Sequence, residues 1–175
     1  LIVAVGAPYH RVSGAGDFLG KVSVYKWDGS TYLPLGSDLI GSDKYDYFGG
    51  QLSLDNEGNT LAVMGPGHDD TSGSTYLNKG RVRVYNYDTA STSWVQSPTS
   101  YDFDGEADGD QSASGNKESR GQRVFLSGDG SKIAIGANEN DGTATDSGHV
   151  RVYELFQPQI IPVADSQDVS FLLYE

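Results

Sequence analysis

The chain has 175 residues, of which 24 are acidic and 12 basic, so its net charge is −12. This balance argues against nucleic acid as a partner, because phosphate binding requires a basic surface, and the absence of cysteine excludes disulfides, zinc–thiolate sites and a cysteine nucleophile. No apolar run approaches the ~20 residues that a membrane-spanning helix needs.

A two-part phrase occurs three times along the chain. The first part reads VAVGAP, LAVMGP and IAIGAN at residues 3–8, 61–66 and 133–138. The second part reads GKVSVY, GRVRVY and GHVRVY at residues 20–25, 80–85 and 148–153. The copies lie 58 and then 72 residues apart, a spacing typical of β units that stack as an array or a propeller.

Each unit is predicted to be a four-stranded antiparallel meander. Its first strand covers 51–54 or 123–126, and a glycine-containing turn follows. The second strand, at 3–5, 61–63 and 133–135, is apolar on both faces and is therefore expected to be buried on both. The fourth strand carries an aromatic residue, at 32–35 and 94–95.

The third strand of each unit alternates in character. Val82 and Val84 share one face, while Arg81, Arg83 and Tyr85 share the other. The same apolar pair recurs in the strands at 22–24 and 150–152, and all three pairs are expected to lie in the interior. The arginine face is either a ligand-binding surface or a packing surface between neighbouring sheets.

The repeats divide the chain into four predicted segments. These are a partial blade at 1–47, a complete blade at 48–112, a blade with an insertion at 113–155, and an atypical closing strand or the start of a further module at 156–175. Fewer than three full units would leave open sheet edges, which pair readily with other strands. We therefore expect either a piece of a longer chain or a subunit that closes against other copies.

Two short motifs in this repeat mark a known family. Phe48-Gly49 precedes an apolar strand, and Gly6-Ala7-Pro8 follows one. With these motifs, residues 1–155 resemble the FG-GAP repeat, the blade unit of integrin-α-type β-propellers and of many surface proteins of microbes and algae. The resemblance implies an all-β fold of consecutive four-stranded antiparallel blades, seen as a partial propeller or an open array. The later copies depart from the pattern, with Met64-Gly65-Pro66 and Gly136-Ala137-Asn138.

Members of this family often carry a calcium loop before the Gly-Ala-Pro strand. Its ligand positions fall here on Ser53, Asp55, Glu57 and Leu61 in one copy, and on Phe125, Ser127, Asp129 and Ile133 in the next. A calcium ion takes about 6–8 oxygen ligands, which an apolar side chain cannot supply. Both segments are therefore predicted to be plain hairpin turns.

The best candidate for a calcium site is the acidic stretch at 102–110. Its carboxylates alternate, and the candidate ligands are Asp104, Glu106, Asp108 and Asp110. The alternative is an exposed acidic loop between blades. Asp46 occupies the place equivalent to Asp110, which favours a turn cap that accepts backbone N–H bonds.

The three histidines do not form an evident set. His10 and His68 occupy equivalent loop positions one repeat apart, and His149 lies on a strand. His68, followed by Asp69 and Asp70, belongs either to a solvated loop or to a metal site. No hydroxyl is singled out as a nucleophile, so we expect a protein that is not an enzyme.

These observations favour a non-enzymatic extracellular or cell-surface module for adhesion or structural assembly. Protein or glycan ligands would contact the variable loops at 7–19, 65–79 and 137–147, because function on a rigid scaffold usually resides in loops. One alternative is a glycan-binding or glycan-hydrolysing propeller, for which the loops offer Tyr9, Tyr76, Asp69 and Asp70. Another is a filament-forming protein that self-associates by pairing blades between chains. No nucleic acid and no membrane insertion are expected.

Overall fold

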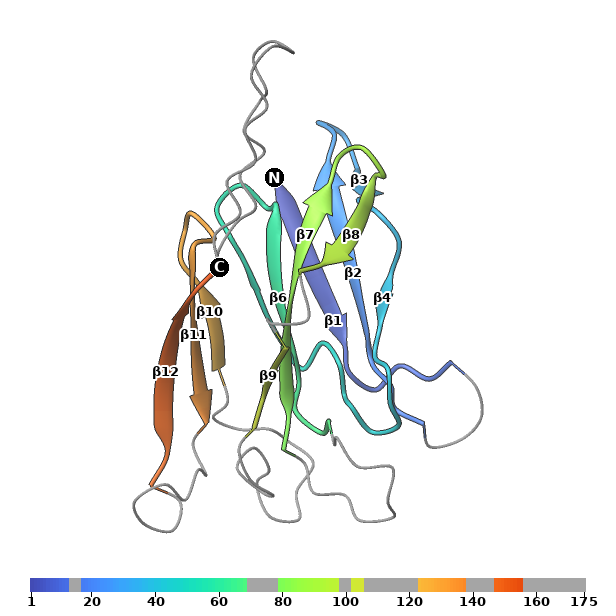
Figure 1. Cartoon of the computed structure of the whole chain (residues 1–175). Coiled ribbons are helices and arrows are strands. Elements are labelled where there is room, and N and C mark those ends of the chain that lie inside the picture. The colour runs from blue at the N-terminus through green and yellow to red at the C-terminus, as the bar shows by residue number, and fades with distance from the viewer. Residues whose placement is uncertain (13–16, 69–78, 98–101, 106–122, 138–146, 156–175) are drawn as a thin grey trace, which may run out of the picture.

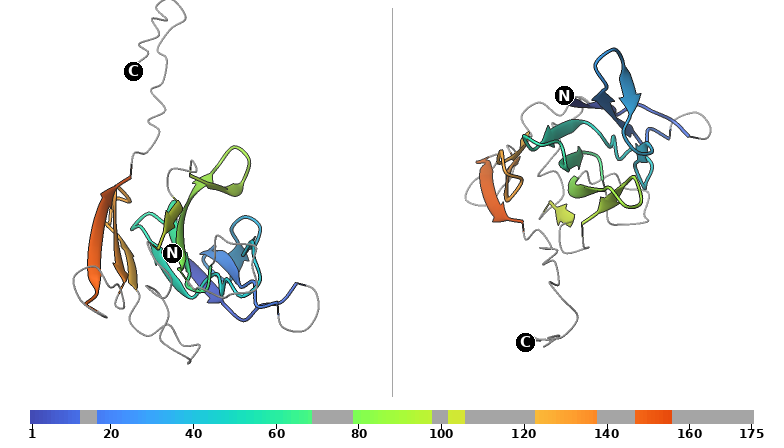
Figure 2. Two further views of the ribbon diagram at one scale, coloured as in Figure 1. Left: turned by 60° about the horizontal axis from the view of Figure 1, so that its bottom comes forward. Right: turned by 90° about the horizontal axis from the view of Figure 1, so that it is seen from above.

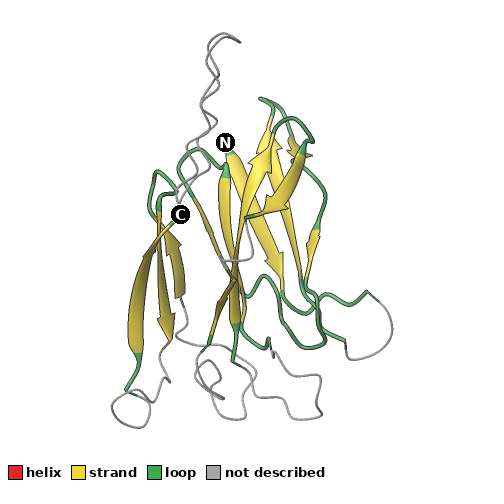
Figure 3. Ribbon diagram, viewed as in Figure 1, coloured by secondary structure: helices red, strands yellow, loops and turns green. Residues whose placement is uncertain are grey.

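The computed structural model describes residues 1–12, 17–68, 79–97, 102–105, 123–137 and 147–155. Every regular element within these ranges is a β-strand, and all pairs of these strands are antiparallel (Figures 1 and 3). The all-β prediction is confirmed. None of the described residues forms a helix long and apolar enough to span a lipid bilayer.

The strands form three sheets in chain order. The first sheet contains β1 (Ile2–Ala7), β2 (Lys21–Trp27), β3 (Tyr32–Pro34) and β4 (Leu39–Ile40). The middle sheet contains β5 (Gln51–Leu54), β6 (Thr60–Gly65), β7 (Arg81–Asp88), β8 (Ser93–Gln96) and β9 (Asp102–Asp104). The third sheet contains β10 (Arg123–Leu126), β11 (Lys132–Ala137) and β12 (His149–Glu154).

Two short strands replace the single fourth strand that the sequence predicts. In the first sheet, β3 and β4 pair with opposite ends of β2, and in the middle sheet β8 and β9 do the same along β7. The start of the acidic stretch is thus a strand and not a loop. Asp102 and Asp104 stand across the ladder from Arg83 and Arg81, and such opposite-charge pairs stabilise a sheet.

The middle sheet packs between the other two, as the views in Figure 2 show. The contact with the first sheet buries Val22, Val24, Phe48, Leu61, Val63, Tyr85 and Trp94. The contact with the third sheet buries Ala62, Met64, Val82, Val84, Val124, Ile133, Ile135 and Leu155. Residues 61–64 of β6 alternate between these two clusters, and all six residues of β6 are buried, which confirms the prediction that 61–63 are buried on both faces.

Two predictions are wrong at the ends of this stack: burial of the second strand on both faces fails for β1, and an interior position of the third-strand valines fails for β12. Val150 and Val152 of β12 are 71% and 65% exposed, and Val5 of β1 is 53% exposed. The reason is position, because their equivalents in the middle sheet are buried by a neighbouring sheet on that side. Among the described residues, no sheet covers the outward faces of β1 and β12.

Close backbone contact explains the glycines of the repeated phrase. A Cβ on Gly6 would lie 2.1 Å from the carbonyl oxygen of Gly49, so these two motif glycines hold β1 against the segment before β5. Gly20, which precedes β2, has a φ of 81° and would bring a Cβ equally close to the carbonyl oxygen of Phe48. Gly80 and Gly148, in the same place of the later copies, also have positive φ, which glycine adopts without a steric penalty.

The second strands of the three sheets run in the same direction. In Figure 1, β1, β6 and β11 all end at the lower side of the molecule, which we call the loop end. The sequence predicts that the variable loops gather there. The described part of this end includes the segments at 8–12, 41–50 and 66–68, between the first and middle sheets.

Candidate functional site at the loop end

His68 lies in a tight turn directly after β6. Its N–H donates to the carbonyl of Gly65 at 3.2 Å, and its carbonyl accepts the N–H of Gly80 at 3.0 Å. His10 makes the same two contacts with Ala7 and Gly20, at 3.0 and 3.1 Å. The predicted equivalence of the two histidines is therefore confirmed, and each one begins the loop that leads to a third strand.

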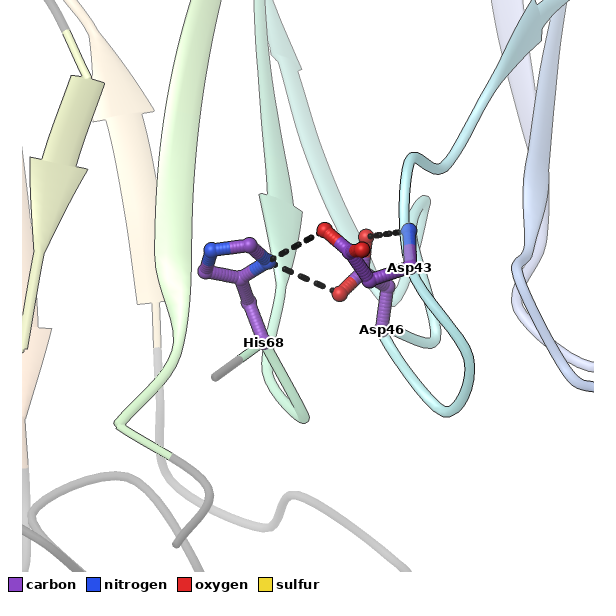
Figure 4. Close-up of side chains that lie close together, drawn as sticks. All are labelled: Asp43, Asp46 and His68. Atoms are coloured by element: carbon purple, nitrogen blue, oxygen red, sulfur yellow. Dashed lines mark hydrogen bonds and ion pairs between the residues drawn. The ribbon is translucent and has the colours of Figure 1, made fainter. Parts of the chain in front are cut away.

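The side chain of His68 is buried and is held by Asp46. The distance from His68 Nδ1 to Asp46 Oδ1 is 2.8 Å, and both side chains are more than nine-tenths buried. The more exposed Asp43 carboxylate lies 3.9 Å from the same nitrogen (Figure 4). The solvated-loop interpretation of His68 is thus wrong, because the segment at 41–46 folds back over the turn.

Asp46 also caps its own loop, as the sequence predicts. Its Oδ2 accepts the backbone N–H of Ser42 at 3.1 Å and that of Asp43 at 2.9 Å. A buried carboxylate costs free energy unless such donors surround it. Asp46 therefore joins two functions, since one oxygen fixes the loop at 41–46 and the other fixes the His68 ring.

The far nitrogen of the His68 ring faces a small pocket. Nε2 is buried and has no hydrogen-bond partner, and in Figure 4 it points away from the two aspartates toward β7. The pocket encloses about 180 Å³, part of it open to solvent, and is lined by Asp46, Phe48, Gly65, His68, Arg81 and Arg83. This volume is below the ~300–1,000 Å³ typical of small-molecule sites.

The arginines of β7 are already engaged by acidic partners. Arg81 forms a two-pronged ion pair with Asp104, through Nε and through the second amino group at 2.8 Å. The hydrogen bonds that Arg81 donates to the Asp104 carboxylate raise the pKa of the Arg81 guanidinium above its ordinary value. Arg83 lies 3.6 Å from Asp102 and donates to the hydroxyl of Ser42 at 3.2 Å.

This arginine face is a packing surface between sheets. Tyr85, next on the same face, belongs to the core between the first and middle sheets. Burial raises the pKa of the Tyr85 hydroxyl, against the opposing influence of the Arg83 charge and hydrogen bond. Of the two interpretations of this face, packing between neighbouring sheets is the one that the contacts favour.

The geometry allows metal binding more readily than catalysis. One ligand atom each from Asp43, Asp46 and His68 lies within 4.8 Å of the other two. An imidazole nitrogen with carboxylates suits a transition metal such as Zn²⁺ better than calcium, which prefers oxygen alone. Catalysis of the serine-hydrolase type would need a hydroxyl on His68 Nε2, and no described hydroxyl donates to that atom.

Of the four candidate calcium ligands in the acidic stretch, one lies within the described residues. Asp104 is directed at Arg81, while Glu106, Asp108 and Asp110 lie outside the described residues, as do Asp69, Asp70 and Tyr76. The two family-type calcium loops are hairpin turns, as predicted. Asp55 accepts the N–H of Asn59 and Thr60 in the first turn, and the family's last ligand position holds the buried Leu61 or Ile133.

A cluster of aromatic rings lies beside the His68 turn, and it was not predicted from the sequence as a unit. Its members are Tyr9, Phe18, Tyr45 and Tyr47, with ring-centre distances between 5.6 and 6.4 Å. The guanidinium of Arg11 lies 4.3 Å from the centre of the Phe18 ring. The available signal was the density of aromatic residues at 45–48, immediately before an apolar strand.

The backbone of this aromatic cluster is unusual. Phe18, Tyr45 and Tyr47 have φ values of 25°, 65° and 51°, a region that costs a non-glycine residue about 1–3 kcal/mol. Backbone hydrogen bonds hold them there, from Tyr45 to the Asp17 carbonyl and from Tyr47 to the Phe18 carbonyl, at 3.0 and 3.2 Å. Such conformations are typical of functional surfaces.

A scan against protein-family models finds no match, and a search of curated proteins finds no significantly similar sequence. The functional argument therefore depends on the residues of this chain.

Proposed function

We propose that the chain is a non-enzymatic extracellular or cell-surface module for adhesion or structural assembly, built from FG-GAP-like units that correspond to propeller blades. The observation that carries the proposal is the aromatic cluster at the loop end. It is held on a stack of three sheets by backbone hydrogen bonds. A protein or glycan ligand would bind there and at the neighbouring variable loops.

The aromatic cluster has the properties of a recognition surface. Tyr9 is 53% exposed, and its ring makes T-shaped contacts with the rings of Phe18 and Tyr47. Tyrosine and phenylalanine offer large apolar faces and lose little conformational entropy on binding. Because the supporting backbone is already fixed, a ligand would not have to order this surface when it binds.

The contacts of the titratable groups support a role other than catalysis. The His68 ring, the Asp46 carboxylate and both arginines of β7 are bonded to partners within the fold. These contacts link the loop at 41–46 to the His68 turn and to β7, and pair β7 with β9. Buried pairs of this kind commonly stabilise structure, so we assign them to the scaffold that carries the loops.

The test is a binding screen with a matched pair of variants. The chain is applied to a glycan array and to immobilised extracellular-matrix proteins. We expect Tyr9→Ala to weaken a positive signal at least tenfold, since Tyr9 is the most exposed ring of the cluster. Tyr32→Ala removes a ring of similar exposure, 42%, from β3 at the opposite end of the molecule, and it should leave binding unchanged. Equal effects of the two changes would contradict the proposal.

The glycan alternative is favoured by one specific observation, the exposed Tyr9 ring with the carboxylate of Asp43 on the neighbouring loop. A sugar ring can stack on the aromatic face and donate its hydroxyls to the acid. Binding confined to the glycan array would select this alternative. Turnover of chromogenic glycosides that is lost in Asp43→Asn would select a hydrolase and contradict the non-enzymatic proposal.

A further inference from the structure

Three side chains that can ligate a metal converge where the loop at 41–46 crosses the turn after β6. One ligand atom each from Asp43, Asp46 and His68 lies within 4.8 Å of the other two. His68 Nδ1 is 2.8 Å from Asp46 Oδ1 and 3.9 Å from Asp43 Oδ2 (Figure 4). A tetrahedral zinc ion, with bonds of about 2.0–2.2 Å, holds its ligand atoms roughly 3.4 Å apart. Small side-chain shifts therefore suffice to place all three around one ion.

The buried histidine distinguishes this cluster from a group of surface acids. The side chains of His68 and Asp46 are 6% and 4% exposed. Backbone hydrogen bonds close the His68 turn, and the N–H groups of Ser42 and Asp43 hold the Asp46 carboxylate. Two of the three ligands are thus oriented before an ion binds, which lowers the cost of binding. Asp43, whose side chain is 61% exposed, gives an ion access from solvent.

An independent observation concerns the second nitrogen of the His68 ring. Nε2 is buried and has no hydrogen-bond partner. The Asp46 carboxylate can only accept, so in the absence of a metal Nδ1 carries a proton. No described contact fixes the protonation of Nε2. The ring can therefore adopt the other neutral tautomer, which places the proton on Nε2 and leaves the lone pair of Nδ1 for a metal.

The charge of the cluster favours a divalent cation. Asp43 and Asp46 bring two carboxylates together, and among the described residues His68 is the only basic side chain within 4 Å of the Asp43 carboxylate. Two carboxylates and a neutral imidazole balance the charge of a divalent ion. An imidazole nitrogen beside carboxylates suits a transition metal, whereas calcium prefers oxygen ligands alone.

We propose that Asp43, Asp46 and Nδ1 of His68 bind a divalent transition metal, for which Zn²⁺ is the probe. Three protein ligands leave the fourth position to water. The ion ties the loop at 41–46 to the turn after β6. Because Asp43 and Asp46 flank Tyr45, whose φ is 65°, the ion also braces the backbone of the aromatic cluster. This site goes beyond the proposed recognition function and does not depend on it.

Zinc binding is measured by isothermal titration calorimetry on the chain after treatment with a chelator and dialysis. We expect the unaltered chain to bind one ion at this site, and its melting temperature to rise with the zinc concentration, because the ion binds the folded state. An excess of Ca²⁺ should not displace the zinc. A chain that binds no zinc and shows no change in melting temperature would overturn the proposal.

Two ligand variants and two matched controls locate the ion. Asp43→Asn and His68→Gln each remove a ligand and should weaken zinc binding by more than the roughly 10–100-fold that loss of an outer-shell partner costs. Asp38→Asn changes another half-exposed acid, and His10→Gln changes the histidine of the equivalent turn. Both controls should retain the affinity of the unaltered chain. Asp43→Asn alters an exposed side chain, so it remains informative if His68→Gln fails to fold.

The tautomer of His68 provides the decisive measurement, by long-range ¹H–¹⁵N NMR of the ring. The zinc-free chain should carry a proton on Nδ1, and the zinc-bound chain should carry it on Nε2 with Nδ1 coordinated. Coordination through Nε2, or a ring that does not respond to zinc, would overturn the proposal. Unchanged zinc affinity in Asp43→Asn would do the same, because the ion would then be bound elsewhere. Tyr9→Ala should leave zinc affinity unchanged, so failure of the metal site and failure of the recognition surface are distinguished.

Discussion

The middle and third sheets contain almost the same third strand and bury it very differently. Residues 80–85 read GRVRVY and residues 148–153 read GHVRVY, and both segments pair with their second strands in the same register. The exposed fractions of Val82 and Val84 are 0% and 1%, against 71% and 65% for Val150 and Val152. Local sequence thus determines the strand, while the position of the sheet in the stack determines which face is buried.

This comparison separates two contributions to stability. The backbone ladder between the second and third strands is common to all three copies of the unit, and each sheet has at least one face packed against a neighbour. The burial of the second face is available only where a neighbour exists. Fully burying a valine stabilises a protein by roughly 1.5–3 kcal/mol, so the middle sheet should be the most stable part of the described chain.

The largest expected effect comes from a charge on this valine pair. Val84→Asp places an unpaired carboxylate inside the core between two sheets and should destabilise the protein by about 4 kcal/mol or more. The equivalent change on the exposed strand, Val152→Asp, should alter the stability of the monomer by about 0.5 kcal/mol or less. Thermal unfolding at low chain concentration measures both. Similar losses would show that β12 is covered in solution and would remove the comparison.

The strands could be predicted from the sequence because the alternation of apolar and polar residues within a strand is a local pattern. The alternation of Val82 and Val84 with charged residues fixed the face that each residue occupies. The exposure of Val150 could not be foreseen, since it depends on a neighbour and not on the strand itself. The same reason applies to His68, whose partner Asp46 lies 22 positions earlier and comes close only when the first and middle sheets pack.

Two glycines with positive φ, one packed against Phe48 and one in an open turn, are expected to differ in their tolerance of alanine. Gly20→Ala would place a Cβ 2.1 Å from the Phe48 carbonyl oxygen in a backbone with a φ of 81°. The strain and the forced shift of backbone should cost about 2–4 kcal/mol. Gly29 also has positive φ, 110°, but nothing lies within 4 Å of its Cβ position, so Gly29→Ala should cost only about 1–2 kcal/mol. Denaturant unfolding separates the two, and equal costs would argue against close packing at Gly20.

The loop end allows a third comparison, between the buried Asp46 and the exposed Asp43. Asp46→Ala leaves the N–H groups of Ser42 and Asp43 and the ring of His68 without their acceptor, a loss of about 1–3 kcal/mol. Asp43→Ala removes a side chain that is 61% exposed and should change stability by about 0.5 kcal/mol or less. Chemical denaturation of the metal-free chain, with a chelator present, checks the values. A larger loss in Asp43→Ala would show that its contact with His68, and not only the turn cap, stabilises this cluster.

The smallest effect is expected at Asp129, which lies in the exposed turn between β10 and β11. The Ser127 hydroxyl, the Ser131 N–H and the Ser131 hydroxyl donate to its carboxylate and lower its pKa from 3.8 to about 2. Because the folded pKa lies below the unfolded value, these bonds stabilise the turn above pH 3.8, and the stabilisation is lost as the pH falls toward 2.

Titration followed by NMR on the Asp129 carboxylate measures this shift directly. Ser127→Ala removes the largest cause and should move the pKa of Asp129 upward. Ser30→Ala, which removes a hydroxyl from the exposed turn of Asp28 in the first sheet, is the matched control and should leave Asp129 unaffected. Because the carboxylate is exposed, water competes for these bonds, and the melting temperature should change much less than in Asp46→Ala. An unshifted Asp129 in the unaltered chain would show that this turn is less ordered than its counterpart around Asp55.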